Sequence, residues 1–263
     1  MSKADGEVAA SKVHIVIPSR YGSNRLPGKP LIDLAGVPMA VRVYRLVKKA
    51  CFEVDVLLAI DDSRIAVVLD DHAVPWVMTK KDHESGTDRI AEVGRLQGWQ
   101  QDDLVINVQG DEPLAPLDML RSFIDFCQAR HDLEMATISA PLESAEDIEN
   151  PNVVKLIVNK NSFANYFSRS PLPFCRDAGN FNHWPVRAFV KHVGVYAYRY
   201  SVLKTLAGFP VSPLEQQEKL EQLRALWHGY EISVFHWHIA PPHGVDTLAD
   251  VVRVNKVLME SNS

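Results

Sequence analysis

The chain has 263 residues, of which 46% are hydrophobic and 23% charged, and its formal net charge at pH 7 is -5. This composition is typical of a globular protein with a sizeable core, and the missing basic surplus argues against nucleic-acid binding. The cysteines, Cys51, Cys127 and Cys175, form no C-x-x-C pair, so we expect no disulfide framework. No apolar run approaches the ~20 residues of a membrane-spanning helix, and we expect no membrane partner.

The first half of the chain alternates between predicted strands and helices. Residues 1–12 are small and polar, and we expect a flexible tail rather than a signal peptide. Strands are predicted at 13–17, 54–60, 74–78, 104–108 and 135–140, and helices from 38, over 63–71, from 88 and over 117–129. This alternation predicts βαβ units, and therefore an α/β fold with a mostly parallel, Rossmann-like sheet.

The second half is less regular. We expect strands at 153–158, 165–167, 193–198 and 232–239, a long loop at 170–185 and a helix at 215–227. Thr247 is expected to cap a final helix, with Asp250 as the acidic third position of a capping box. Since no repeat or linker interrupts the chain, we predict one domain over 13–263 with a smaller antiparallel subregion at about 155–215.

Three loops of the first half, 19–30, 79–87 and 109–113, each follow a predicted strand. In open parallel sheets the ligand crevice lies beyond the carboxyl ends of the strands. We therefore expect these loops to converge on one crevice.

The first loop, RYGSNRLPGK at 20–29, holds two glycines and three cations, which favours binding of a polyphosphate. It is not a Walker A loop, because five residues separate its glycines and Pro30 follows Lys29. The alternative is a solvated basic turn.

Two acidic residues are candidate ligands of a hard cation. Asp111 lies in QGDEP after a predicted strand, and Asp246 precedes the final helix. Mg²⁺ is normally held by one or two carboxylates together with substrate phosphates. The alternatives are an acidic turn at Asp111 and a helix-capping role for Asp246.

The loop from His83 to Arg89 offers an anion- or base-binding surface through Ser85, Gly86 and Thr87. The alternative is that Thr87 caps the following helix. His236 and His238 could share one face of a strand, but no third ligand has convincing spacing for zinc, so we favour a half-exposed strand.

Several stretches together resemble the CMP-Kdo synthetase (3-deoxy-manno-octulosonate cytidylyltransferase) family. They are IPSRYGSNRLPGKPL, DHESGTDRIAEV, VINVQGDEP, YFSRSPLP, KHVGVYAYR, LEQLRALWHGY and GVDTLADV. The resemblance covers nearly the whole chain from about Val13. CMP-sialate synthetases share the fold and CTP, but their phosphate loop lacks the R-L-P-G-K-P ending found here.

The resemblance implies a fold of the nucleotide-diphospho-sugar transferase type, with homodimers formed through the second-half subregion. It implies cytidylyl transfer from CTP to Kdo with Mg²⁺ in the cytoplasm, for lipopolysaccharide biosynthesis. The implied catalytic residues are Arg20, Lys29, Asp111 and Asp246, of which Asp111 and Asp246 would bind Mg²⁺. The implied nucleotide-binding residues are Arg20, Ser23, Lys29, Ser85, Gly86 and Gln109, and the implied sugar-binding residues are Arg169, His192, Tyr196, Glu215 and Gln216.

The exact acidic sugar stays open at this point. Ile60 stands where a Thr is common in the family, and Lys191 where an Arg often precedes the His. The 8-amino analogue of Kdo and sialate are therefore alternative substrates. Other rival interpretations are activation of a sugar 1-phosphate and a non-catalytic nucleotide-binding module, although the latter would not need both aspartates.

Overall fold

The computed structural model describes residues 11–22, 26–83, 85–179 and 183–260. Ser23, a predicted phosphate ligand, and most of the predicted tail lie outside these residues. The last two residues of that tail are fixed, because Ser11 Oγ donates to Asp102 O and Lys12 N donates to Asp103 Oδ1 at 3.0 Å. None of the helices described in these ranges has the length and apolarity that a membrane span requires.

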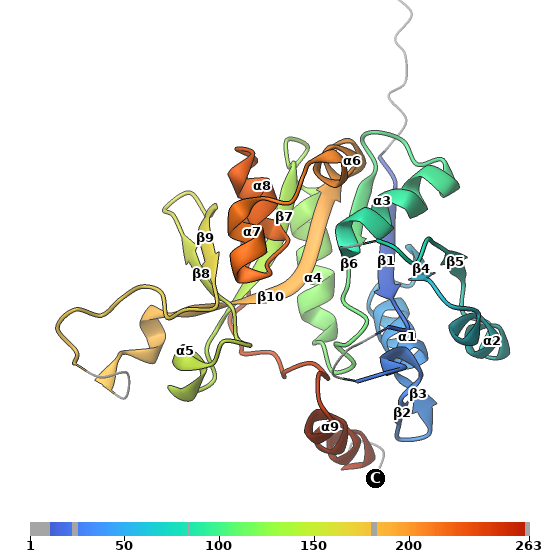
Figure 1. The fold of residues 1–263 in the computed structure, drawn as a ribbon, viewed down its shortest axis with the longest axis horizontal. Coiled ribbons are helices and arrows are strands. Elements are labelled where there is room, and N and C mark those ends of the chain that lie inside the picture. Colours follow the sequence, from blue (N-terminus) through green and yellow to red (C-terminus); the bar gives the residue numbers. More distant parts are fainter. Residues whose placement is uncertain (1–10, 23–25, 84, 180–182, 261–263) are drawn as a thin grey trace, which may run out of the picture.

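One nine-stranded sheet runs through the molecule (Figure 1), with its main strands in the order β11-β7-β10-β6-β1-β4-β5. All pairings along this order are parallel except the two made by β10. This arrangement confirms the predicted α/β fold with a mostly parallel sheet. The strands are β1 (Val13–Ser19), β4 (Asp55–Ile60), β5 (Trp76–Met78), β6 (Leu104–Asn107), β7 (Met135–Pro141), β10 (Val190–Arg199) and β11 (Ile232–His236).

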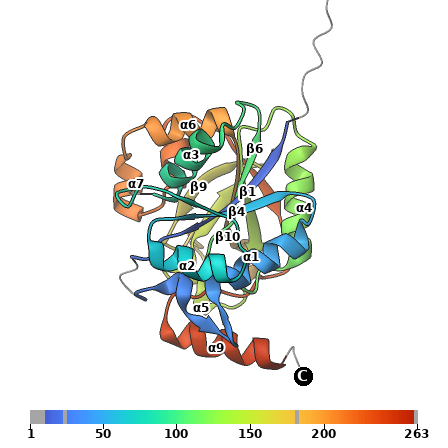
Figure 2. The ribbon, with the colours of Figure 1, turned by 90° about the vertical axis from the view of Figure 1, so that its right-hand side faces the viewer.

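Helices cover both faces of this sheet (Figures 1 and 2). Helices α1 (Met39–Ala50) and α4 (Leu117–Gln128) lie on one face, and α3 (Gly86–Gln97) and α6 (Tyr200–Gly208) lie on the other. The centre of strand β1 is apolar because Ile15 and Ile17 pack into the first layer while Val16 packs into the second. Helix α2 (Ser63–Asp71) follows β4.

An antiparallel subregion extends from one end of the sheet. Strands β8 (Lys155–Val158) and β9 (Ala164–Ser168) form a hairpin, and β8 also pairs with β10. A small apolar cluster beside it includes Trp184 and Phe189 together with Ile148 from the short helix α5 (Glu146–Glu149). The subregion agrees with the predicted antiparallel insertion.

The predicted helix over 215–227 is wrong. The chain forms α7 (Pro213–Glu218) and α8 (Gln222–Trp227) instead, since Lys219 between them takes a left-handed conformation with φ 54°. The predicted strand over 232–239 ends early, at His236. His238 therefore lies beyond the strand, and His236 Nδ1 lies 3.0 Å from Ser139 Oγ.

A separate two-stranded sheet packs against the last helix. Strands β2 (Asp33–Leu34) and β3 (Val37–Pro38) form a hairpin, and the 3₁₀ helix η1 (Lys29–Leu31) precedes it. The last helix, α9 (Leu248–Glu260), is fixed to this hairpin by Asn255, whose Oδ1 accepts from Ala35 N at 2.6 Å. The chain therefore places the segment before α9 close to the basic loop.

Candidate active site

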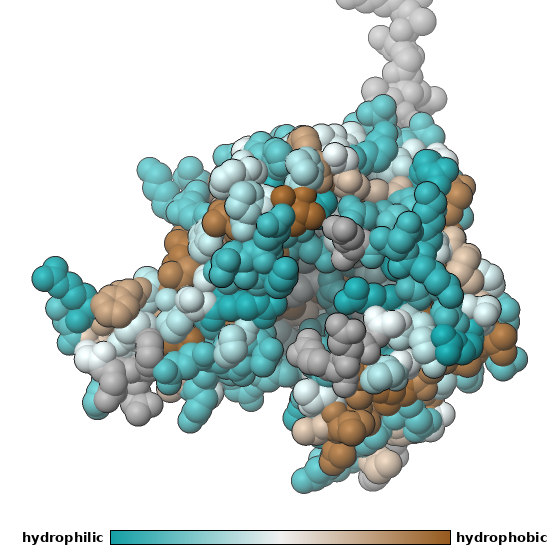
Figure 3. Space-filling model, viewed as in Figure 1, coloured by the Kyte–Doolittle hydropathy of each residue, from teal (hydrophilic) through white to brown (hydrophobic). Residues whose placement is uncertain are grey.

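A cleft of about 660 Å³ opens beyond the carboxyl ends of β1 and β6. All three predicted loops contribute to its lining, which confirms their expected convergence. Figure 3 shows hydrophilic side chains around the hollow on this face. The predicted site residues that line it are Arg20, Lys29, Ser85, Gly86, Gln109, Asp111, Arg169, His192, Tyr196 and Asp246.

Lys29 lies between the two predicted metal ligands. Its Nζ is 2.5 Å from Asp111 Oδ2 and 3.0 Å from Asp246 Oδ1. Burial opposes the charge of Lys29, but the two carboxylates raise its pKa above the ordinary value. The fold thus brings together three charged residues from distant parts of the sequence.

Two glycines make this arrangement sterically possible. Gly28 has a left-handed backbone with φ 67°, and its N–H donates to Tyr21 O, which closes the basic loop just before Lys29. Gly110 lies so close to β1 that a Cβ there would come within 2.8 Å of Pro18 O. A larger residue at either position would move Lys29 or Asp111 away from the cleft.

Asp246 is fixed by its own backbone and by the following helix. The neighbouring Val245 N donates to Asp111 O at 2.8 Å. Thr247 Oγ1 accepts from Asp250 N, and Asp250 Oδ2 accepts from Thr247 N and Asp246 N. The predicted capping box is confirmed, and since Thr247 caps the helix, the Asp246 carboxylate is directed to Lys29.

The Asp111–Asp246 pair suits a hard divalent cation. The carboxylate oxygens of Asp111 and Asp246 are ligands of the type that Mg²⁺ binds. The Lys29 ammonium already places positive charge between the two carboxylates. Nearby Glu112 has its pKa raised to about 8 by burial and by the Asp111 charge. No group of three or more His, Cys, Asp or Glu side chains arranged for a metal occurs among residues 11–22, 26–83, 85–179 and 183–260, so substrate oxygens and water would have to complete the coordination.

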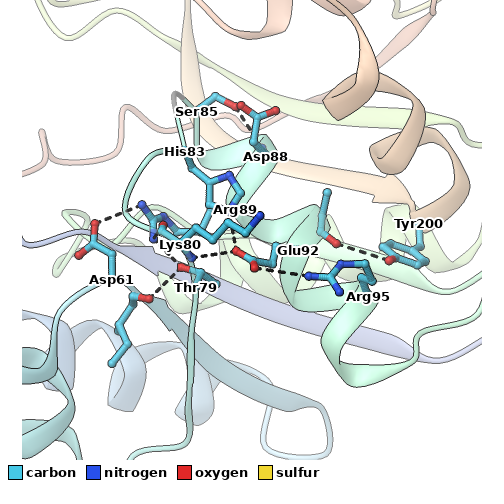
Figure 4. A network of polar contacts seen from close by, with 12 residues as sticks. Asp61, Thr79, Lys80, His83, Ser85, Asp88, Arg89, Glu92, Arg95 and Tyr200 are labelled. Carbon is cyan, nitrogen blue, oxygen red and sulfur yellow. Dashed lines mark hydrogen bonds and ion pairs between the residues drawn. The ribbon is translucent and has the colours of Figure 1, made fainter.

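The third loop begins α3 at Gly86 rather than at residue 88, because Ser85 Oγ accepts from Asp88 N at 3.0 Å. Ser85, and not Thr87, is therefore the N-cap. Figure 4 shows the network behind this loop, in which buried Arg89 donates to Asp61 Oδ2 at 3.2 Å and to Thr79 Oγ1.

Asp61 connects this network to the basic loop. Its Oδ1 accepts from Tyr21 N at 2.8 Å, while its Oδ2 faces Arg89. The loops that begin at Arg20 and at His83 are thereby held in one relative position.

Strand β10 carries His192 and Tyr196 on the opposite side of the cleft. His192 Nε2 lies 3.0 Å from Thr137 Oγ1, and burial lowers the pKa of His192 to about 3. Burial also raises the pKa of Tyr196. Both side chains are therefore neutral groups that can exchange hydrogen bonds with a polar ligand.

Arg169 also lines the cleft, but its guanidinium is largely engaged within the protein. It donates to Glu218 O at 2.8 Å, to Pro151 O at 2.8 Å and to Lys219 O at 3.5 Å. These bonds hold the turn between α7 and α8, and two of the five guanidinium N–H groups have no partner among the described residues.

Glu215 and Gln216 are not among the described residues that line the cleft, which corrects their predicted place in the sugar site. Glu215 is buried, and its two carboxylate oxygens accept from Arg224 at 2.8 and 2.7 Å. It also forms a capping box with Ser212 at the start of α7. Gln216 is exposed on α7.

The cleft receives instead the second Glu-Gln pair of this segment, Glu221 and Gln222, which the sequence analysis did not select. The Glu221 carboxylate accepts from Gly86 N at 3.3 Å and from Thr87 Oγ1 at 3.2 Å. Both pairs stand in the sequence as Glu-Gln, and they differ in the structure because Arg224 holds Glu215 and the chain turns at Lys219 before Glu221.

The sequence model of the cytidylyltransferase family matches residues 14–232. The chain belongs to the cytidylyltransferase family. It is 51% identical over 254 residues to 3-deoxy-manno-octulosonate cytidylyltransferase 2 of Paraburkholderia phytofirmans, with 96% of each chain covered. It is 43% identical over 249 residues to the 3-deoxy-manno-octulosonate cytidylyltransferase of Nitrosococcus oceani, covering 93% of this chain and 96% of that one.

A solved structure supports the same family. The CMP:2-keto-3-deoxy-manno-octonic acid synthetase complexed with CTP is 39% identical to this chain, and the two superpose with a TM-score of 0.86. The match covers 95% of this chain and all of the other. The cytidylyltransferase described here therefore shares both sequence and fold with a protein that binds CTP.

Proposed function

We propose that this cytidylyltransferase transfers a cytidylyl group from CTP to Kdo and releases pyrophosphate. The observation that carries the proposal is the cluster of Lys29, Asp111 and Asp246 beside Arg20 in one cleft. The names of the relatives support Kdo as the acceptor, and the CTP complex of the structural neighbour supports the donor.

The reaction joins the anomeric 2-hydroxyl oxygen of Kdo to the α-phosphorus of CTP. The bond from that phosphorus to the bridging oxygen breaks, pyrophosphate leaves with the electron pair, and the hydroxyl proton passes to water. Catalysis of this type depends mainly on positioning and charge stabilisation. Arg20 and Lys29 would neutralise negative charge on the leaving pyrophosphate.

We propose Asp111 and Asp246 as the ligands of Mg²⁺. The bound metal would supply charge neutralisation at the α-phosphate and favour ionisation of the attacking hydroxyl. The chain contributes two carboxylates and the Lys29 ammonium at the start of η1, which would exchange a carboxylate partner for a phosphate oxygen when CTP binds. No dedicated side-chain base is assigned.

The acidic sugar would bind on the β10 side of the cleft, at His192 and Tyr196. Arg169 is the proposed cation for the sugar carboxylate through the N–H groups that its backbone contacts leave available. Glu221 and Gln222 replace Glu215 and Gln216 as the proposed contacts from the α8 side. We propose Kdo rather than its 8-amino analogue or sialate because the relatives are named for Kdo.

Three further parts of the proposal concern the cell and the assembly. We propose that the product serves lipopolysaccharide biosynthesis, that the reaction occurs in the cytoplasm, and that the chain forms a homodimer through the antiparallel subregion. The dimer proposal rests on the family resemblance, and Phe174, whose side chain is 74% exposed in this subregion and packs edge-to-face on Trp184, is the residue at which it can be tested.

The test is pyrophosphate release from CTP, UTP or ATP with Kdo, its 8-amino analogue or sialate. We expect the highest kcat/KM with CTP and Kdo, because a site built for one set of hydrogen bonds leaves groups unpaired with the other bases. Equal rates with UTP and CTP, or no release with Kdo, would contradict the proposal.

A further inference from the structure

The last residue of β6, Asn107, is a buried polar side chain at the floor of the cleft. It is 3% exposed, and its Oδ1 has no hydrogen-bond partner among the described residues. It is also among the residues that line the cleft. The two residues before it, Val105 and Ile106, are apolar and fully buried.

An unpartnered amide in this environment requires an explanation. A buried acceptor that has lost its contact with water and gained no partner destabilises the folded state, whereas an apolar side chain of similar size does not. Native structures contain few such groups, and a functional role, a bound water or an ion is the usual explanation of each. Packing alone would favour a third apolar residue after Val105 and Ile106.

The position of Asn107 in the sheet indicates what its partner is. The strand register pairs Asn107 with Val16 of β1 on one side and with Tyr196 of β10 on the other. Figure 1 shows β6 between these strands. β1 leads into the basic loop at Arg20, whereas β10 carries the side chains proposed for the sugar. Asn107 therefore lies where the nucleotide and sugar sides of the cleft meet.

The chemistry of the carboxamide fits a sugar hydroxyl. The Asn side chain has an amide oxygen that accepts hydrogen bonds and an NH₂ group that donates two. Rotation about χ2 can turn either group to the cleft. A hydroxyl group is likewise both donor and acceptor. Gln222 lines the same cleft, is also buried, and has an Nε2 with no partner among the described residues, so two amide residues with unmet hydrogen bonds line one space.

We propose that Asn107 binds a hydroxyl group of the acidic sugar and positions the sugar against the nucleotide, a role that rests on the proposed function. Asn107 is thus a specificity-determining residue of the acceptor site. Since its hydrogen bond forms only with bound substrate, the free protein gains no stability from it.

The test compares wild type with Asn107→Leu, which keeps the size and removes the hydrogen bonds. We expect kcat/KM for Kdo to fall about 10- to 100-fold, with KM for CTP changed by no more than about threefold. The midpoint of thermal unfolding should be unchanged or higher. Asn107→Ala is the second variant in case leucine disturbs the fold, and the same kinetic pattern is expected from it.

Asn159→Leu is the matched control. Asn159 Oδ1 accepts from Asn161 N and Phe163 N in the β8–β9 turn, so its replacement should lower stability and leave KM for Kdo unchanged. Singly deoxygenated Kdo analogues add a coupling measurement. Wild type should have a much lower kcat/KM for the analogue that lacks the contacted hydroxyl than for Kdo. Asn107→Leu should have nearly the same kcat/KM for both.

The outcomes separate this inference from the proposed function. If wild type releases no pyrophosphate from CTP and Kdo, the proposed function fails and the inference fails with it. If wild type is active but Asn107→Leu loses stability in proportion to activity, or loses affinity for CTP rather than Kdo, only the role of Asn107 is overturned.

Discussion

At the scale of single residues, the central feature is a lysine that bridges two aspartates. The side chain of Lys29 is 14% exposed, whereas those of Asp111 and Asp246 are 33% and 44% exposed. The lysine is therefore better shielded from water than its partners. Its charge would hold the pair together until substrate phosphates and a divalent cation compete for these groups.

Replacing Lys29 by Met should make the protein sensitive to divalent cations. Without Mg²⁺ we expect a loss of about 1–2 kcal/mol in the free energy of unfolding, because two neighbouring carboxylates lose their shared cation. Mg²⁺ without CTP should raise the unfolding temperature of the variant more than that of wild type. Cytidylyl transfer should fall strongly in both conditions.

Lys81→Met is the control for this prediction. Lys81 is exposed, and its ammonium lies 3.6 Å from the carboxylate of Asp62 rather than beside Asp111 and Asp246. It should show the wild-type response to Mg²⁺. Equal responses of wild type and Lys29→Met would show that the lysine does not compete for the aspartates.

His192 makes a second prediction at this scale. Burial lowers its pKa to about 3, whereas the ordinary value is about 6.5. Between these values the unfolded chain binds a proton that the folded chain does not, so folding stability falls as pH decreases. Between pH 6.5 and pH 5, the free energy of unfolding of wild type, measured in urea, should fall by about 1–2 kcal/mol more than that of His192→Gln. Parallel stability curves for the two proteins would contradict this.

At the scale of elements, α3 and α6 pack so closely that glycine is required at position 94. A Cβ there would come within 2.2 Å of Tyr200 Cε2 and 2.7 Å of Trp99 Cε3. Gly94→Ala should therefore lower the free energy of unfolding by about 1–3 kcal/mol, despite the better helix propensity of alanine. Urea titration provides the measurement.

Gly208→Ala, at the end of α6, is the matched substitution. An added Cβ would meet nothing within 4 Å there, and we expect unchanged or slightly higher stability. If Gly94→Ala behaves in the same way as Gly208→Ala, the helices can separate without cost and the packing argument is wrong.

The elements also show how far the sequence predicts this fold. The hydrophobic periodicity predicts the bounds of α2 and α4 to within one residue. The ends of the predicted strands also place the loops around the cleft correctly. Helix α6 was missed, although Tyr200, Leu203 and Leu206 are buried at helical spacing. The break at Lys219 could not be predicted, because nothing in a lysine indicates a left-handed backbone.

The same limit applies to the candidate site. Motif residues whose neighbours fix their direction, such as Lys29 after Gly28, were placed in the cleft correctly. Glu215 was misplaced because its partner Arg224 and the helix break both depend on tertiary structure. Asn107 gives no sequence signal beyond being a polar residue at the end of an apolar strand.

At the scale of the whole molecule, the proposed dimer has a direct test. Phe174→Asp adds charge to an exposed aromatic in the antiparallel subregion. We expect light scattering after size exclusion to show weaker association of the variant at equal concentration, with an unchanged unfolding profile for the diluted chain. Phe52→Asp, at a comparably exposed phenylalanine that lies far from Phe174 in the sequence, is the control. Identical masses for wild type and Phe174→Asp would place any dimer interface elsewhere.

The proposed function depends most on one arrangement, in which distant halves of the chain bring Asp111 and Asp246 to one cation beside CTP. A crystal structure with CTP and Mg²⁺ measures it directly. We predict that carboxylate oxygens of both residues lie about 2.0–2.1 Å from the same metal ion, or contact it through one bound water, and that Lys29 contacts phosphate. Carboxylates of Asp111 and Asp246 that lie far from one shared metal would contradict the proposed metal site.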